Sequence, residues 1–166
     1  MLLFSIWYHG KSLIKKTFYN IIYSKKINIG AKTTWRRNFS ILIEKNAKVI
    51  IKKNCFFNND CSIVAMKSVI IGEGTLLGEN VKIYDHNHKF NRSKIPIKKQ
   101  GFSVGEVYIG NHCWIGSNVV ILKGSHIGNN CVIGAGCVIN GNIPDNTIVK
   151  ITPSCMENVK LISKDD

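Results

Sequence analysis

The chain has 166 residues, which is typical of one domain, and its 23 Lys and Arg residues outnumber its 10 Asp and Glu residues to give a formal net charge of +13. Such a charge favours an anionic partner, whether a phosphorylated cofactor, an acidic polymer, nucleic acid or a membrane surface. The sequence contains no recognised nucleic-acid-binding motif and its basic residues are scattered, so nucleic acid is not expected as a partner.

The N-terminal segment, Met1 to Tyr23, is aromatic and basic. Its apolar run from Leu2 to Tyr8 is too short to cross a membrane, and its positive residues follow the run, so neither a transmembrane span nor a signal peptide is expected. Four later apolar residues share one helical face, with lysines nearby: Ile14, Phe18, Ile21 and Ile22. Two interpretations stay open, namely a helix that caps the first coil of the domain and a helix that lies on a membrane surface.

Isoleucine recurs at six-residue intervals in the second half of the chain, at Ile109, Ile115, Ile121, Ile127, Ile133 and Ile139. This period fits neither a helix nor an ordinary strand. It is typical of a parallel β-helix whose chain turns a corner every six residues and stacks triangular coils of eighteen. The isoleucines are expected to fill the interior. Glycines often follow them, and we expect these to allow the backbone angles of a tight corner: Gly110, Gly116, Gly128 and Gly134.

Two earlier runs keep the same period: Ile71, Leu77 and Ile83, and, offset by a two-residue insertion, Ile51, Phe57 and Ile63. The period breaks once, at about 84–103, which predicts a projecting loop. The predicted fold is all-β, a β-helix of hexapeptide coils over residues 27–142. Helical or irregular caps are expected at 1–26 and 143–166, and all three parts form a single domain.

Five of the six cysteines fall two residues before a corner position: Cys55, Cys61, Cys113, Cys131 and Cys137. This phase indicates small buried side chains with free thiols, rather than disulfides or metal ligands. Free thiols suit a cytoplasmic location. Cys155 lies outside the pattern.

The start of the loop carries Asp85, His86 and His88, and the next coil carries Trp114 in the stretch NHCWIGS. Histidine is suited to take a proton from a hydroxyl group near neutral pH, because its reference pKa is about 6.5. A base, a carboxylate and an indole near a projecting loop favour a catalytic site. From spacing alone, a surface turn with incidental histidines is the alternative.

Three stretches, IGEGTLLGENVKIYDHNHKF, VYIGNHCWIGSNVVILKGSHIG and NNCVIGAGCVINGNIPDNT, resemble the left-handed β-helix hexapeptide acyltransferases. Within that family the chain is similar to the sugar O-acetyltransferases, including those that act on maltose, galactosides and cell-surface polysaccharides. The similarity spans about Ile43 to Pro153, and its most specific part is the histidine-bearing loop followed by N-x-x-W-I-G. The left-handed coil is an implication of the resemblance, because parallel crossovers are generally right-handed.

The resemblance implies direct transfer of an acetyl group from acetyl-CoA to a hydroxyl of a sugar or cell-surface glycan. It also implies a homotrimer with active sites between subunits. No metal ion is expected, and the location expected from the free thiols is the cytoplasm, with the inner face of the membrane as the alternative that the N-terminal helix suggests. His88 is the implied general base, with His86 as the alternative, because two histidines stand where maltose acetyltransferases have one. Asp85 is expected to orient a histidine or bind the acceptor, and Asn58 to line the acceptor pocket.

Acetyl-CoA is expected, from the same resemblance, in the groove between adjacent prisms. Backbone groups at coil corners would hold it, at positions matching Ser117, Ala135, Asn140 and Gly141. Trp114 is expected beside the thioester. The family usually ends with a segment such as G-x-P-A-K, whose basic residue approaches the coenzyme A phosphates. Here only Pro153 matches, so Lys123, Lys150 or the loop lysines are expected to substitute.

Three other functions stay open. An antibiotic acetyltransferase of the virginiamycin type shares the fold and a loop histidine. A metal hydrase like γ-carbonic anhydrase needs three histidines that converge on zinc. His86 and His88, however, are only two residues apart, and His126 precedes a corner isoleucine and should point outward. A non-catalytic β-helix scaffold is the third.

Overall fold

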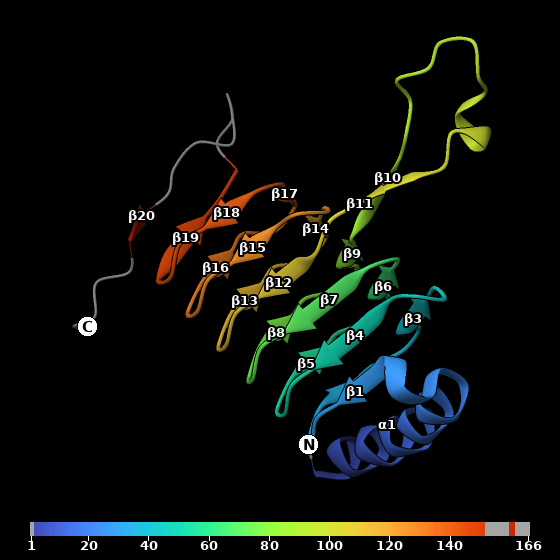
Figure 1. The fold of residues 1–166 in the computed structure, drawn as a ribbon. Helices are drawn as coiled ribbons and strands as arrows, with labels where there is room; N and C mark the ends of the chain where they lie inside the picture. The colour runs from blue at the N-terminus through green and yellow to red at the C-terminus, as the bar shows by residue number, and fades with distance from the viewer. Residues whose placement is uncertain (1, 152–159, 162–166) are drawn as a thin grey trace.

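The computed structural model describes residues 2–151 and 160–161, and the side chains of residues 12–151. A long helix, α1 (Leu2–Tyr23), and a short 3-10 helix, η1 (Ser24–Lys26), come first in the chain. They precede three sheets of parallel strands, and each sheet forms one side of a β-helix (Figure 1). The predicted hexapeptide β-helix is therefore confirmed.

Each sheet takes one strand from each successive coil. The six-stranded sheet contains β1 (Ile27–Ile29), β4 (Lys48–Ile51), β7 (Ser68–Ile71), β12 (Val107–Ile109), β15 (His126–Ile127) and β18 (Asn142–Ile143). The seven-stranded sheet contains β2 (Thr34–Trp35), β5 (Phe56–Phe57), β8 (Leu76–Leu77), β13 (Trp114–Ile115), β16 (Val132–Ile133), β19 (Thr147–Val149) and β20 (Lys160–Leu161). The five-stranded sheet contains β3 (Ser40–Ile43), β6 (Ser62–Ala65), β9 (Lys82–Tyr84), β14 (Val120–Ile121) and β17 (Val138–Ile139). Only β20 runs antiparallel to its neighbour in these sheets.

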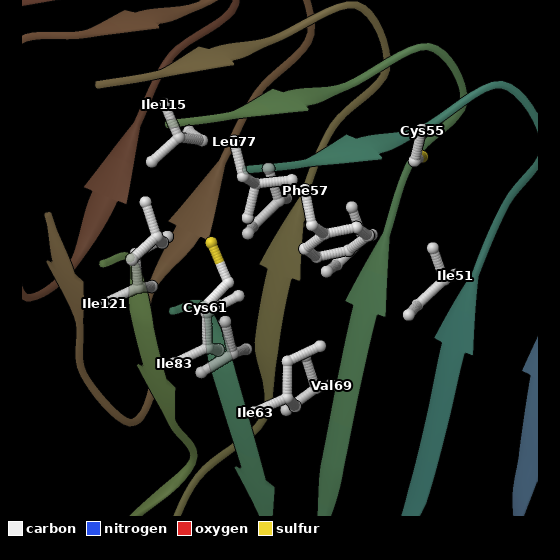
Figure 2. Packing of buried hydrophobic residues seen from close by; sticks show 14 of the residues in the cluster. Ile51, Cys55, Phe57, Cys61, Ile63, Val69, Leu77, Ile83, Ile115 and Ile121 are labelled. Carbon is white, nitrogen blue, oxygen red and sulfur yellow. The ribbon is translucent and has the colours of Figure 1, made fainter. Parts of the chain in front are cut away.

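The isoleucine period sets the register of the sheets. Ile109 pairs with Ile127, one eighteen-residue coil further along the chain. Ile71 pairs with Ile109, because the projecting loop lengthens that coil. In Figure 2 the side chains of Phe57 and Leu77 follow one another inside the prism, each at most 1% exposed. Burying one such side chain stabilises the fold by about 1.5–3 kcal/mol, so the repeated core supplies most of the driving force.

The glycines after the isoleucines have a different role from the expected one. None of these four has a positive φ: Gly110, Gly116, Gly128 and Gly134. A Cβ on Gly110 would lie only 2.4 Å from the carbonyl oxygen of Gly128 in the next coil, so glycine is required there by close packing of the backbones. Among the described residues, six of the ten non-glycine residues with a positive φ are asparagines, which tolerate that conformation: Asn38, Asn54, Asn80, Asn118, Asn130 and Asn146.

The five predicted interior cysteines are buried and free, as expected. The thiol of Cys113 donates to the carbonyl oxygen of Gly128 at 3.1 Å, and that of Cys131 to the carbonyl oxygen of Pro144 at 3.0 Å. Burial raises the pKa of these thiols, that of Cys113 to about 11. They are small interior side chains that satisfy carbonyl groups of the next coil. Cys155 lies outside the described residues.

Helix α1 lies across the N-terminal end of the prism, so the predicted cap is confirmed (Figure 1). The face in contact is an aromatic and polar one: the Tyr19 hydroxyl donates to the Phe39 carbonyl at 3.3 Å, and the Trp35 amide donates to the Ser12 hydroxyl at 3.2 Å. The four residues that the sequence placed on one apolar face are exposed instead: Ile14, Phe18, Ile21 and Ile22. Among the described helices none is both long and apolar enough to span a bilayer.

The coil continues beyond residue 142, where the C-terminal cap was expected to begin. Strands β18 and β19 pair in parallel with β15 and β16 and form two sides of a sixth coil. The rest of the expected cap, apart from β20, lies outside the described residues.

Candidate active site

The projecting loop leaves the prism after β9 and returns at β12, as predicted (Figure 1). Its base is an antiparallel pair of strands that the sequence did not predict, β10 (His86–His88) and β11 (Phe102–Val104). A 3-10 helix, η2 (Ile97–Lys99), lies between them in the chain. Because His88 pairs with Phe102, the histidines stand on an ordered ladder rather than on an irregular turn.

Asp85 anchors the base of this loop. Its carboxylate is fully buried and accepts three backbone hydrogen bonds of 2.6 to 2.8 Å, from Met66, Lys67 and Ser68. Met66 and Lys67 are the two residues between β6 and β7, and Ser68 is the first residue of β7. The amide of Gly105 also donates to the Asp85 carbonyl, at 2.8 Å. One residue therefore ties together the insertion and both ends of the loop.

The same carboxylate contacts His86. Nδ1 of His86 lies 3.2 Å from Oδ1 of Asp85, and the histidine side chain is 16% exposed. The ring also packs edge-on against Phe102, with centroids 5.5 Å apart. A carboxylate at one ring nitrogen sets the tautomer and the direction of the other. Full burial of Asp85 favours the orienting role among the two that the sequence left open.

His88 is exposed and borders a cleft. Its ring packs against Phe102, with centroids 4.4 Å apart and a tilt of 39°. The cleft has a volume of about 410 Å³ and is lined by Asn87, His88, Lys89, Phe90, Asn91, Ser103 and Lys123. Lys123 follows β14 in the prism, whereas the other lining residues come from the loop. The structure thus brings His88 together with one of the residues expected to serve the coenzyme.

The other predicted coenzyme residues lie on two edges of the prism. Asn140 and Gly141 follow β17, one coil beyond Lys123 and on the edge from which the loop projects. Ser117 and Ala135 follow β13 and β16, on the edge between the seven-stranded and five-stranded sheets. The five-stranded sheet separates the two groups.

Asn58 and Trp114 also lie away from the cleft. Asn58 follows β5 on the same edge as Ser117, and its side-chain oxygen accepts a hydrogen bond from Arg36 at 3.3 Å. Trp114 is 57% exposed on the outer face of β13. Within one copy of the chain, neither residue is brought to His88.

Two contributors were missed by sequence reasoning, Phe102 and Ser103. They lie on β11, which pairs with the histidine strand β10. This antiparallel pairing lies outside the six-residue repeat. The available signal was the short alternation of apolar and polar residues in Phe-Ser-Val after the glycine at 101.

The described residues contain no group of three His, Cys, Asp or Glu side chains that could hold a metal ion. His126 is exposed on the outer face of β15, where its ring stacks on Tyr108 at 4.6 Å. It therefore points outward, as predicted. Pro153, the one residue that matches the family's C-terminal segment, lies outside the described residues.

Comparison with known proteins matches residues 106–141 to a family described as bacterial transferase hexapeptide (six repeats). The chain is 32% identical over 161 residues to an Escherichia coli (strain K12) protein named "Putative lipopolysaccharide biosynthesis O-acetyl transferase WbbJ", covering 93% of this chain and 82% of that protein. The structure of a maltose O-acetyltransferase from Clostridium difficile 630 is 28% identical with a TM-score of 0.71, covering 87% of this chain and 75% of that one. A galactoside acetyltransferase solved in complex with coenzyme A is 28% identical with a TM-score of 0.61, covering 81% and 66%.

Proposed function

The chain belongs to the hexapeptide-repeat acetyltransferases, and we propose that it transfers an acetyl group from acetyl-CoA to a sugar hydroxyl of a cell-surface glycan such as lipopolysaccharide. The similarity to the E. coli lipopolysaccharide O-acetyl transferase carries this proposal, because it spans nearly the whole chain. The maltose and galactoside relatives support a sugar acceptor, and the galactoside enzyme supports coenzyme A as the carrier.

His88 is the proposed general base. It is the histidine that lines the cleft, and the face of Phe102 restricts its ring. When bound, acetyl-CoA supplies a thioester carbonyl. His88 takes the proton of the acceptor hydroxyl as the hydroxyl oxygen bonds to that carbonyl carbon. The carbon–sulfur bond then breaks, and the proton passes from the histidine to the departing sulfur. General-base catalysis of this kind contributes about 100- to 10,000-fold.

His86 and Asp85 are proposed to position the base. The buried carboxylate holds His86, His86 packs on Phe102, and Phe102 packs on His88. Two of these contacts are between rings on paired strands, so a shift of one ring displaces the next. This arrangement holds His88 over the cleft while the Asp85 carboxylate stays buried behind it.

The cleft lining suits an anionic group. Lys89 and Lys123 line it, and no Asp or Glu is among its lining residues. A phosphate of coenzyme A or an acidic sugar would be attracted by these lysines. We therefore assign Lys123 to the anionic part of one substrate, in place of the basic residue that the C-terminal segment lacks.

The complete site is proposed to form between copies of the chain. His88 and Lys123 lie on one edge of the prism, whereas Asn58, Trp114 and Ser117 lie beyond the five-stranded sheet. A closed homotrimer would place the second group of one copy against the cleft of its neighbour, and closed cyclic assemblies are common among soluble homo-oligomers. The groove between prisms would then hold the pantetheine arm of coenzyme A.

The proposal is tested by measuring coenzyme A release from acetyl-CoA in the presence of lipopolysaccharide O-antigen, capsular saccharides and free sugars, with mass spectrometry of the products. We expect release that depends on a saccharide, and a product that is heavier by one acetyl group. Virginiamycin-type antibiotics in the same assay test the alternative acceptor. Failure to acetylate any saccharide while an antibiotic is acetylated would contradict the proposed substrate class.

A further inference from the structure

We propose that the outward face of α1 docks the protein onto an anionic membrane surface. This face consists of five large apolar side chains, each between 54% and 76% exposed: Leu13, Ile14, Phe18, Ile21 and Ile22. Single exposed apolar residues are ordinary in proteins, but a contiguous group on one element marks an interaction surface.

The direction of this face follows from helix geometry. Ser12 and Tyr19 are seven residues apart and buried against the prism, whereas Ile14 and Ile21 are 75% and 76% exposed. Two residues advance a helix by about 200°, so each isoleucine lies on the side opposite its buried neighbour. The same seven-residue spacing reaches back to Trp7 in the sequence.

Hydrogen bonds keep the helix in this orientation. Lys16 donates to the Gly30 carbonyl at 3.0 Å, and Tyr19 and Lys15 both donate to the carbonyl of Phe39. Rotating α1 to bury its isoleucines would break these bonds and leave carbonyl groups at the end of the prism without donors. The hydrogen bonds between α1 and the prism therefore keep the apolar face of the helix exposed. Because its other side is bonded to the prism, α1 cannot insert across a bilayer and can bind one only by lying along its surface.

The positive charge around α1 indicates that the partner of the apolar face is anionic. Residues 1–59 contain 12 Lys and Arg residues and one acidic residue, Glu44, whereas residues 60–166 contain 11 basic and 9 acidic residues. A charge of +11 out of +13 thus belongs to the end that carries α1. Lys25 and Lys26 follow the helix directly, and Lys32 lines a small cleft together with Leu13.

An apolar helical face beside many lysines is the pattern of helices that lie in the membrane interface, with apolar side chains among acyl chains and lysines near anionic headgroups. A second copy of the chain does not fit this face, because two such ends would bring +11 against +11. A bilayer surface that contains phosphatidylglycerol matches both the apolar and the charged parts. The inference concerns a surface remote from the cleft and does not depend on the proposed acetyl transfer.

The test is co-sedimentation of the full-length protein with vesicles of phosphatidylcholine alone or with about one third phosphatidylglycerol, a fraction chosen to give a clearly negative surface. The variant Ile14→Ser/Ile21→Ser removes the two most exposed residues of the face. Ile97→Ser/Ile151→Ser is the matched control, because these isoleucines are 54% and 51% exposed elsewhere. Circular dichroism verifies folding, and light scattering reports the assembly state of each variant.

We expect the wild-type protein to sediment with the anionic vesicles and much less with the neutral ones, and added salt to weaken this binding. The α1 variant should bind at least about tenfold more weakly, since two buried isoleucines contribute strongly to partition, whereas the control should bind like wild type. Equal binding by the α1 variant, or no preference for phosphatidylglycerol, overturns the proposal. It is also overturned if Ile14→Ser/Ile21→Ser reduces the size of the assembly, because the face would then be covered by a second copy.

Discussion

Replacing Asp85 should destabilise the protein strongly, through the backbone rather than through catalysis. Asp85→Ala removes the acceptor of three amides: that of Ser68 is buried, and those of Met66 and Lys67 are partly buried. A buried group left unsatisfied costs about 1–3 kcal/mol, and each lost hydrogen bond of a partly buried amide costs about 0.5–1.5 kcal/mol, so we expect a loss of about 2 kcal/mol or more in the free energy of unfolding. Asp85→Asn keeps the oxygen that accepts from Lys67 and Ser68 but presents an amide to Met66, and should cost about half as much.

The measurement is urea unfolding at one fixed protein concentration, because assembly contributes to apparent stability. Glu106→Ala is the matched control. Glu106 reaches the same insertion through an exposed contact with Lys67 at 3.7 Å, and exposed ion pairs contribute at most about 1 kcal/mol. If Asp85→Ala and Glu106→Ala lowered the unfolding free energy by similar amounts, the role assigned to Asp85 at the base of the loop would be wrong.

Three further results are expected. Light scattering at micromolar concentration should give the mass of a trimer; a fully active monomer would contradict a site shared between copies. Raising the salt concentration should increase KM for one substrate with little change in kcat, and charge reversal at Lys98 and Lys99 should do the same and weaken the salt effect; if KM responds to neither, the basic loop does not attract a substrate. Burial raises the pKa of Cys113 from 9.0 to about 11, so this thiol should resist iodoacetamide at neutral pH until the protein is unfolded. The unfolded thiol loses its proton first, so Cys113 should also contribute a loss of stability as pH rises from about 9 to about 11, and rapid labelling of the native protein would contradict its burial.

The repeated part of the fold was predictable because one residue of each hexapeptide carries the register. Ile109, Ile115 and Ile121 fall on three different sheets, and each pairs with the isoleucine one coil further on. The same pattern predicted the positions of the glycines, but it did not predict why glycine is required there. Nothing within a single hexapeptide indicates that the next coil passes within 2.4 Å of a Cβ placed on Gly110.

The orientation of α1 was not predictable from its apolar spacing. The open end of a β-helix presents backbone carbonyls, such as those of Gly30 and Phe39, and these require donors more than apolar side chains. Tyr19 supplies both a hydroxyl and a ring that packs against Trp35, with centroids 6.4 Å apart. The helix therefore turns Lys15, Lys16 and Tyr19 toward the prism and leaves the isoleucines at 14, 21 and 22 outside.

The cleft was partly predictable. Asp85, His86 and His88 are near one another in the chain, so their proximity required no long-range information. The contribution of Phe102 depends on an antiparallel pairing outside the hexapeptide period. The hydrogen bonds that residues 66–68, at and directly after the insertion, donate to Asp85 join two irregularities that the period treats as unrelated.

The catalytic role of His88 is the central claim, and it is tested most directly by comparing His88→Ala with His86→Ala in the coenzyme A release assay, once a saccharide acceptor has been found. We expect His88→Ala to lower kcat by about 100-fold or more, the scale of general-base catalysis, while calorimetry shows that acetyl-CoA still binds. His86→Ala should lower kcat less, because it disturbs only the position of Phe102 and His88. An inactive His86→Ala variant beside an active His88→Ala variant would contradict the account and move the base to the histidine held by Asp85.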